Sequence, residues 1–235
     1  MCKALASLFP AGAVVAELRE PGDVSRLLPA ETACLGGAVI KRAREFAGGR
    51  ECARRALAEF GINDFPIVAA RDRQPVWPDQ FTGSITHTRG LCAAVVVERD
   101  RFLGVGIDIE IAGEVRTDLW PAICVPEEIA WLQSLPHRER TTAATLLFSA
   151  KEAYYKCQYP VTGRRLNFHD LRIEPHAWGA GAGAFDVRLL RRRDGAPHCA
   201  GMPVNGRYLL HESFVSTGVA WPAARGSINR PASID

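Results

Sequence analysis

The stretch from Phe102 to Glu110 constrains the fold more than any other segment, because it alternates strictly between two kinds of residue. Aliphatic side chains occupy one set of alternate positions, namely Leu103, Val105, Ile107 and Ile109. Glycines and acids occupy the other set, namely Gly104, Gly106, Asp108 and Glu110. A two-residue period is typical of a β-strand, in which alternate side chains share one face. The segment is therefore predicted to be a strand whose glycines leave the acidic face open for a bulky ligand.

The acids of this strand are candidates for a metal site. Asp108 and Glu110 would leave one face with their backbones about 6.6 Å apart, so their carboxylates can share one hard cation. Further along the chain, Glu152 and Lys156 are four residues apart in a segment with helical character, which places them on one stripe. The residues alone leave a plainer alternative open, in which the two acids are solvated and the helix carries a surface ion pair.

The rest of the chain alternates irregularly between predicted helices and strands. One helical region covers roughly Glu31 to Phe60 and is interrupted at Gly48-Gly49. A second helix covers Thr141 to Gln158 and is ended by Pro160. Short strands with tight connections surround both. This pattern favours an α+β fold over a doubly wound sheet.

Composition excludes several classes of protein. A chain of 235 residues with 47% hydrophobic and 23% charged residues is that of an ordinary globular protein of one or two domains. The net charge of +3 is too small to indicate a nucleic-acid partner. The seven cysteines are scattered and form no Cys-x-x-Cys pair, which favours reduced thiols in a cytoplasmic protein. No secretory segment or membrane span is expected.

Three motifs, in their order and separations, resemble the Sfp-type phosphopantetheinyl transferases. They are Gly83-Ser84-Ile85-Thr86-His87, Val105-Gly106-Ile107-Asp108-Ile109-Glu110 and Phe148-Ser149-Ala150-Lys151-Glu152-Ala153-Tyr154-Tyr155-Lys156. Two further segments are similar to the bacterial branch that contains enterobactin-type and mycobacterial-type enzymes, namely Trp77-Pro78-Asp79 and the basic stretch from Lys41 to Arg54. The resemblance extends from about Leu35 to Phe168.

The resemblance implies a monomer with two similar α+β halves in one chain, each a small antiparallel sheet with packed helices. We expect a first half at residues 1–106 that holds the phosphate side of coenzyme A. A second half at residues 107–225 would carry the metal site and the lysine helix. Residues 226–235 would form a loose tail.

The implied activity is transfer of 4′-phosphopantetheine from coenzyme A to a serine of an apo acyl or peptidyl carrier protein, with release of adenosine 3′,5′-bisphosphate. Carriers of siderophore, polyketide or nonribosomal peptide synthesis are the expected partners. Asp108, Glu110 and Glu152 would hold Mg²⁺, or Mn²⁺ in its place, and Asp108 would also face the coenzyme. Glu152 would accept the serine proton, directly or through a water, and Lys156 would stabilise the transferring phosphoryl group or the leaving group.

The resemblance also implies contacts with the phosphates of coenzyme A. Arg42 and Arg50 match arginines that grip the 3′-phosphate, a task suited to the planar guanidinium fork. His87 would contact a phosphate of coenzyme A and assist catalysis. Thr86 beside it would bind the same phosphate region.

Further basic residues are expected to contact phosphate. Lys151 would bind phosphate or support the metal ligands. A basic residue that is common near Ala69 in the bacterial branch is missing here, and its charge would come from Arg71 or Arg73.

Two other functions remain alternatives. One is a different Mg²⁺-dependent enzyme that processes nucleotides or phosphates and needs no carrier surface. The other is a carrier-binding module without catalytic activity, which retention of all three carboxylates and both lysines disfavours.

Overall fold

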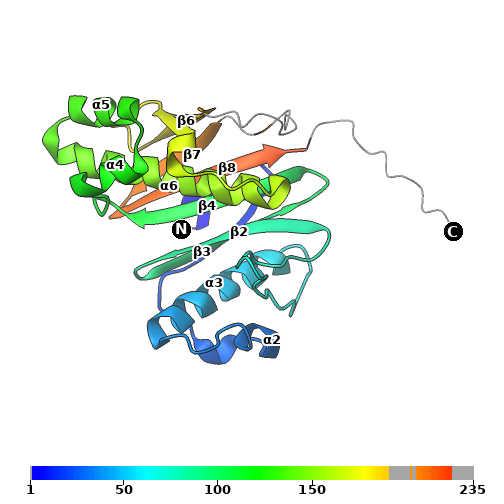
Figure 1. The fold of residues 1–235 in the computed structure, drawn as a ribbon. Helices are drawn as coiled ribbons and strands as arrows, with labels where there is room; N and C mark the ends of the chain where they lie inside the picture. Colours follow the sequence, from blue (N-terminus) through cyan, green and yellow to red (C-terminus); the bar gives the residue numbers. More distant parts are fainter. Residues whose placement is uncertain (1, 191–201, 203–204, 224–235) are drawn as a thin grey trace.

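The structure is a computed structural model that describes residues 2–190, 202 and 205–223. The chain folds into two halves that lie against each other, each with one long helix on an antiparallel sheet (Figure 1). The first half contains α1 (Cys2–Ala6), β1 (Val14–Leu18), η1 (Val24–Arg26), α2 (Pro29–Thr32), α3 (Ile40–Ala58), β2 (Phe81–Thr88) and β3 (Leu91–Glu98). The second half contains β4 (Phe102–Ile111), η2 (Thr117–Leu119), α4 (Trp120–Ile123), α5 (Pro126–Ser134), α6 (His137–Thr162), η3 (Phe168–Asp170), β5 (Leu171–Pro175), β6 (Ala182–Leu189), β7 (Asn205–His211) and β8 (Phe214–Pro222).

The two sheets pack face to face between the two long helices. Their strand orders are β1-β3-β2 and β4-β8-β7-β6-β5, and every neighbouring pair is antiparallel. Side chains of β3 explain the layering, since Val95 lies in the core between the sheets and Val96 in the core under α3. A strand buried on both faces reads as a continuous apolar run, as β3 does. The predicted α+β class with two antiparallel sheets is confirmed.

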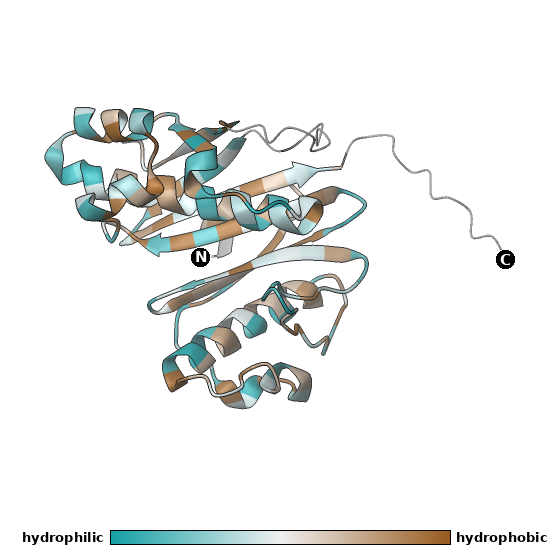
Figure 2. Cartoon of the chain, viewed as in Figure 1, coloured by the Kyte–Doolittle hydropathy of each residue, from teal (hydrophilic) through white to brown (hydrophobic). Residues whose placement is uncertain are grey.

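Strand β4 faces two different layers, and Figure 2 shows hydrophobic and hydrophilic residues alternating along it. Val105, Ile107 and Ile109 enter the core between the sheets. Leu103 departs from the predicted alternation because the register shifts between Phe102 and Gly104. Phe102 therefore takes the core position, and Leu103 is exposed.

The two halves repeat one topology, which confirms the predicted duplication. The order β1, α2, α3, β2, β3 corresponds to β4, α5, α6, β7, β8, and the ladder β1-β3-β2 corresponds to β4-β8-β7. The isolated bridge between Ala69 and Pro75 stands where the second half has β5 and β6. The second sheet is thus an extended version of the first.

The change from one sheet to the other occurs at the turn after β3. Strand β4 belongs to the second sheet from Phe102 onward, so the expected division at residue 106 lies inside this strand. The predicted tail at 226–235 lies outside the described residues. Within the described part of the chain, no helix combines the length and the apolar character needed to cross a membrane.

Both long helices continue past the predicted breaks. Gly48 and Gly49 lie inside α3, because their missing side chains let the helix pack closely on the sheet. An added Cβ at Gly48 would lie 2.7 Å from Cys92 Sγ, and one at Gly49 would lie 2.7 Å from a methyl of Ile85. Helix α6 likewise passes Pro160 and ends at a left-handed Gly163 with φ of 65°.

The glycine face of β4 is not open, contrary to the prediction. Helix α6 lies directly on it, and a Cβ at Gly106 would collide with the carbonyl oxygen of Ala153. A Cβ at Gly104 would similarly meet the carbonyl oxygen of Cys157. The glycines therefore admit a helix backbone, and this close approach brings Glu152 of α6 near the acids of β4.

Candidate active site

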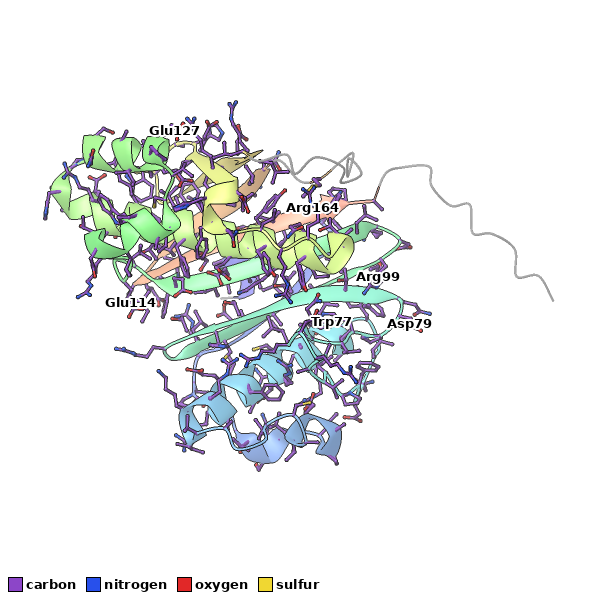
Figure 3. The ribbon with its side chains drawn as sticks, viewed as in Figure 1. Trp77, Asp79, Arg99, Glu114, Glu127 and Arg164 are labelled. Carbon is purple, nitrogen blue, oxygen red and sulfur yellow. The ribbon has the colours of Figure 1, made fainter. Side chains whose placement is uncertain are left out.

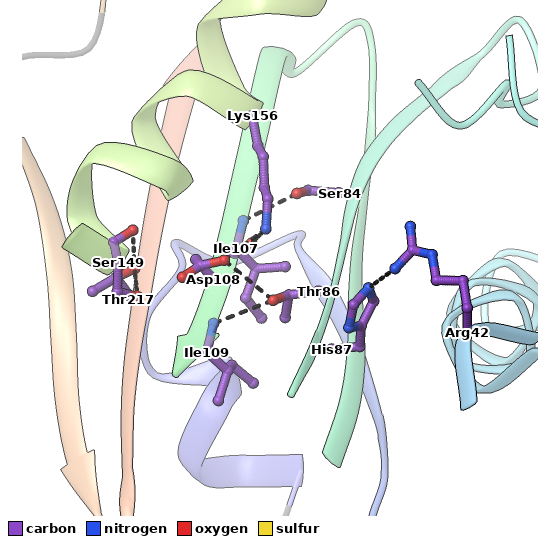
Figure 4. Close-up of polar contacts among 10 residues, drawn as sticks. All are labelled: Arg42, Ser84, Thr86, His87, Ile107, Asp108, Ile109, Ser149, Lys156 and Thr217. Carbon is purple, nitrogen blue, oxygen red and sulfur yellow. Dashed lines mark hydrogen bonds and ion pairs between the residues drawn. The ribbon is translucent and has the colours of Figure 1, made fainter. Parts of the chain in front are cut away.

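The centre of the candidate site is Asp108, a carboxylate that is 3% exposed on β4. Its Oδ1 accepts a hydrogen bond from Lys156 Nζ at 2.6 Å and one from Thr86 Oγ1 at 3.3 Å (Figure 4). Its Oδ2 is buried and has no hydrogen-bond partner among the described residues. A buried carboxylate oxygen without a partner is costly, so this atom is available for a cation.

A ladder of side-chain hydroxyls joins the two halves at this point. Ser84 Oγ on β2 accepts from the Ile107 backbone N–H at 3.2 Å, and Thr86 Oγ1 accepts from Ile109 N–H at 3.3 Å (Figure 4). Strand β4 is an edge strand of its sheet, so these hydroxyls satisfy donors that a neighbouring strand would otherwise pair. Thr86 was predicted to bind the phosphate region of coenzyme A, and neither Thr86 nor Ser84 was predicted to join the halves. The alternate hydroxyls of this strand were the available signal.

Helix α6 supplies the other two charged groups of the site. Ser149 Oγ and Thr217 Oγ1 are 2.8 Å apart, and Thr217 Oγ1 also donates to the Ser149 carbonyl at 2.9 Å, which holds the helix on β8 (Figure 4). Lys156 extends from the helix to Asp108, and its Nζ also lies 3.3 Å from the Ile107 carbonyl. Glu152, one turn earlier, is half-buried beside them.

The carboxylates raise one another's affinity for protons. Burial, followed by the negative charge of Asp108, raises the pKa of Glu110 to about 7. Burial also raises the pKa of Glu152; Lys156 opposes that rise and Asp108 adds to it. A divalent cation would reverse both shifts, because it favours the charged form of each carboxylate.

The carboxylates of Asp108, Glu110 and Glu152 do not converge on one point. Among residues 2–190, 202 and 205–223, no three His, Cys, Asp or Glu side chains are placed to hold a metal ion. The Lys156 ammonium is the cation that Asp108 contacts. The free Oδ2 of Asp108 and the oxygen chemistry of the three acids nevertheless fit a hard divalent ion.

His87 and Arg42 form a contact on the first half. Arg42 Nη1 lies 2.7 Å from His87 Nε2 (Figure 4), and Glu45 Oε2 lies 3.8 Å from His87 Nδ1. Burial and the charge of Arg42 lower the pKa of His87, so a neutral imidazole accepts from the guanidinium. The Arg42 side chain is 55% exposed and keeps further donors free for an anion.

The other predicted arginines differ in their surroundings. Arg50 is 7% exposed, donates from Nε to the Ile67 carbonyl at 2.9 Å and stacks on Phe46 at 3.9 Å. Burial lowers its pKa to about 10. Arg71 and Arg73 are exposed on the loop between Ala69 and Pro75, and of these two Arg73 lines the cavity described below.

Lys151 occupies a different environment from the one expected. Its side chain is 0% exposed, and its ammonium donates to Glu128 Oε2 at 2.7 Å, to the Ile123 carbonyl at 2.8 Å and to the Phe168 carbonyl at 3.0 Å. A lysine ammonium has three protons, and all three are used here. The predicted phosphate contact is therefore corrected, because Lys151 has no free donor.

A cavity of about 660 Å³ opens between the halves beside this site. Its walls come from the loop and strand of the first half and from the end of α6, including Arg73, Trp77, Ser84, Arg99, Glu152 and Lys156. Figure 3 shows Trp77 and Arg99 on the first half and Arg164 near the end of α6. The volume suits a sizeable ligand whose charged end meets Lys156.

Two stacked tyrosines form part of the cavity wall and were not predicted as site residues. Tyr155 and Tyr159 lie on α6 with ring centroids 5.1 Å apart, and Tyr159 Oη lies 3.5 Å from Asp72 Oδ2 across the gap. Their spacing of four residues beside Glu152 and Lys156 was the available signal.

Comparisons with known proteins agree with this arrangement. Residues 30–97 match the family described as "4'-phosphopantetheinyl transferase N-terminal domain", and residues 104–199 match the "4'-phosphopantetheinyl transferase superfamily". The 4'-phosphopantetheinyl transferase Npt of Nocardia iowensis is 36% identical over 92% of this chain and 98% of its own length. The 4'-phosphopantetheinyl transferase Svp of Streptomyces mobaraensis is 36% identical over 97% of this chain and 93% of its own.

A third relative matches over a shorter region. Enterobactin synthase component D of Salmonella typhi is 42% identical over 49% of this chain and 48% of its own length. The two matched families together span both halves, and the longer relatives cover nearly the whole chain. The chain therefore belongs to the 4′-phosphopantetheinyl transferases, and it is a transferase that uses coenzyme A as its substrate.

Proposed function

We propose that this transferase moves 4′-phosphopantetheine from coenzyme A to the serine hydroxyl of an apo acyl or peptidyl carrier protein. Adenosine 3′,5′-bisphosphate is the leaving product. The observation that carries the proposal is the group formed by Asp108, Glu110, Glu152 and Lys156, which borders a cavity between the two halves. Such a group combines oxygen ligands for a cation with an ammonium for phosphate oxygens.

Asp108, Glu110 and Glu152 are the residues that would hold Mg²⁺, or Mn²⁺ in its place. The unpartnered Oδ2 of Asp108 and the raised pKa values of the two glutamates support this assignment. When bound, the ion would offset negative charge on the pyrophosphate as the bond to the leaving group stretches.

Glu152 and Lys156 have distinct proposed roles in the transfer. We assign Glu152 the serine proton, because its half-buried carboxylate lines the cavity beside Lys156. Lys156 is partly exposed and would turn its third N–H donor, which neither Asp108 nor the Ile107 carbonyl uses, to an oxygen of the transferring phosphoryl group. Asp108 holds the Lys156 ammonium in place for this contact.

The first half supplies the proposed contacts with the nucleotide phosphates. Arg42 is exposed beside His87, and the two together offer an anion several N–H donors. Thr86 links the same strand to Asp108. Arg50 is buried against Phe46. We therefore propose that it supports the phosphate-binding region around Arg42, in addition to the phosphate contact.

The cavity between the halves would receive the uncharged part of coenzyme A. Its aromatic wall of Trp77, Tyr155 and Tyr159 offers apolar surface, and Arg73 stands among its lining residues. Arg73 rather than Arg71, which does not line the cavity, is therefore our choice for the basic residue absent near Ala69.

Similarity to enterobactin synthase component D suggests carriers of siderophore synthesis as the first ones to test. Carriers of polyketide and nonribosomal peptide synthesis are the next to test, as the resemblance of the three motifs implies. We further propose that the enzyme works as a monomer in the cytoplasm, because both halves of the site come from one chain and the described cysteines are free thiols.

The test is intact-mass analysis of apo carriers after incubation with the enzyme, coenzyme A and Mg²⁺. A gain of one phosphopantetheine group supports the proposal. Absence of a gain across acyl and peptidyl carriers, with coenzyme A consumed, would favour a different Mg²⁺-dependent phosphate enzyme. Carrier binding without mass gain or consumption would favour a non-catalytic module.

A further inference from the structure

The buried pair of Lys151 and Glu128 joins several elements around the start of the site helix. The Lys151 ammonium contacts the end of α4 through Ile123 and the start of η3 through Phe168. A hollow of about 470 Å³ borders the Lys151 residue, yet its side chain exposes no surface to it. The ammonium is therefore closed to ligands and fully committed to protein oxygens.

Glu128 extends these contacts to two further elements. Its Oε2 accepts from the Val125 backbone N–H at 2.9 Å, which caps α5, and its Oε1 accepts from the Ile173 N–H of β5 at 2.7 Å. A buried carboxylate with these donors and a lysine partner is fully paired. We call the pair and its four backbone partners the Lys151 node: Ile123, Val125, Phe168 and Ile173.

The first half contains the same arrangement without any of the reacting carboxylates. Glu31 is 0% exposed; its Oε2 accepts from Leu28 N–H at 2.9 Å and its Oε1 from Ile67 N–H at 2.9 Å. Arg54 of α3 donates to Glu31 Oε2, as Lys151 of α6 donates to Glu128. Both glutamates stand two residues after a helix-starting proline. The repeat indicates that this node fastens a helix to its half and does not bind substrate.

The difference between the halves lies in what each helix carries. Glu152 follows Lys151 directly and Lys156 comes five residues later, whereas no reacting group adjoins Arg54. Successive helix residues are separated by about 100° of rotation, so holding Lys151 also sets the direction of Glu152. The contact at Gly106 sets how near α6 lies to β4, but a backbone contact of this kind does not by itself set the helix rotation.

We propose that Lys151 and Glu128 are positioning residues for the transfer reaction, which set the rotation of α6 so that Glu152 and Lys156 meet Asp108. Lys151 thus acts through its neighbours and binds no phosphate of coenzyme A. The inference rests on the proposed function for its kinetic test. Misplacement of a reacting group by about 1 Å costs up to about a hundredfold in rate, so loss of this node is expected to lower kcat.

The experiment compares Lys151→Met with Arg54→Met, which removes the equivalent cation from the first half. Both variants are expected to lose thermal stability. Lys151→Met should lower kcat about tenfold or more and leave the KM for coenzyme A within about twofold. Arg54→Met should leave kcat within about twofold, because α3 carries only binding residues. If Lys151→Met does not fold, Lys151→Met/Glu128→Gln replaces it, since that variant leaves no buried charge unpaired.

Two direct binding measurements complete the test. Calorimetry with coenzyme A in EDTA should give wild-type affinity for Lys151→Met, and electron paramagnetic resonance should show Mn²⁺ binding weakened about fivefold or more. A tenfold loss of coenzyme A affinity with unchanged kcat would identify Lys151 as a phosphate ligand and overturn the inference. Wild-type kinetics and Mn²⁺ binding with lower stability alone would also overturn it.

The measurements separate this inference from the proposed function. If the wild-type chain modifies no carrier, the proposed function fails, and the Mn²⁺ comparison between Lys151→Met and Arg54→Met still decides the role of the node. Equal Mn²⁺ affinity in both variants would then reject it.

Discussion

The two halves share a topology and a buried glutamate but contribute different charged groups to the candidate site. The first half contributes Arg42 and His87, which are suited to holding an anion. The second half contributes Asp108, Glu152 and Lys156, which are suited to the chemistry. The two halves therefore have the same topology but differ in the residues that lie where the edge strands β2 and β4 meet. This difference predicts that changes in the first half affect binding and changes in the second half affect turnover.

The largest expected effect is that of Glu110→Gln, which should lower transfer by about three orders of magnitude because it removes one of the three proposed anionic metal ligands. The fold should persist, since the amide has the same shape and one buried negative charge is lost. Timed intact-mass spectra of a carrier measure the rate. Glu114→Gln, an exposed neighbour, should stay within about twofold, and full activity of Glu110→Gln would remove Glu110 from the site.

Gly106→Ala should be the most damaging change to stability, by about 3 kcal/mol, because the new methyl meets a helix backbone that cannot move alone. The matched change in the first half is Gly49→Ala. There the nearest atom is the Ile85 methyl, which can shift, and alanine favours the helix by about 1 kcal/mol. Urea unfolding of both variants makes the comparison. Equal losses would show that the two helix–sheet contacts are alike.

Arg42→Gln should raise the KM for coenzyme A about tenfold with kcat nearly unchanged, since it removes a charged donor from an exposed anion contact. Steady-state kinetics with varied coenzyme A give both constants. Arg44→Gln, an exposed arginine on the same helix, serves as the control. A fall in kcat alone would contradict the division of work between the halves.

Ser84→Ala should destabilise the fold by about 1–2 kcal/mol, because the Ile107 N–H loses its acceptor in a buried position. The substitution removes one of the hydroxyl contacts between β2 and β4. It therefore tests how much these contacts stabilise the association of the two halves. Denaturant titration measures the change. An unchanged free energy of unfolding would mean that water replaces the hydroxyl.

The last comparison concerns pH in the metal-free protein. Glu110 releases its proton at a pKa of about 7 when folded and at about 4.5 when unfolded, so the folded state binds more protons between these values. Stability should therefore fall as pH rises through this window, and Glu110→Gln should flatten the slope. Melting curves in EDTA from pH 5 to pH 8 check this. Equal slopes in the wild type and in Glu110→Gln would refute the assignment, because the shifted pKa values of His87 and Glu152 affect both proteins.

Local patterns were sufficient for much of the fold and for the residue types of the site. The alternation around Asp108 predicted β4, and the order of the three motifs predicted the family and the two-half fold. These features follow from short-range geometry, because strand and helix periods decide which neighbouring side chains share a face. The break at Gly48-Gly49 was wrong, because packing on the sheet outweighed local helix preference.

Long-range contacts decided the rest. Lys151 and Lys156 are chemically identical and five residues apart, yet the first is enclosed by Glu128 and two carbonyls while the second reaches Asp108. Similarly, the glycine face of β4 receives α6, and Ser84 pairs with a strand of the other half. Which partner a lysine, glycine or hydroxyl meets depends on elements distant in the chain, and a local period carries no information about them. The tertiary structure alone therefore separated the lysine of the site from the lysine that holds its helix.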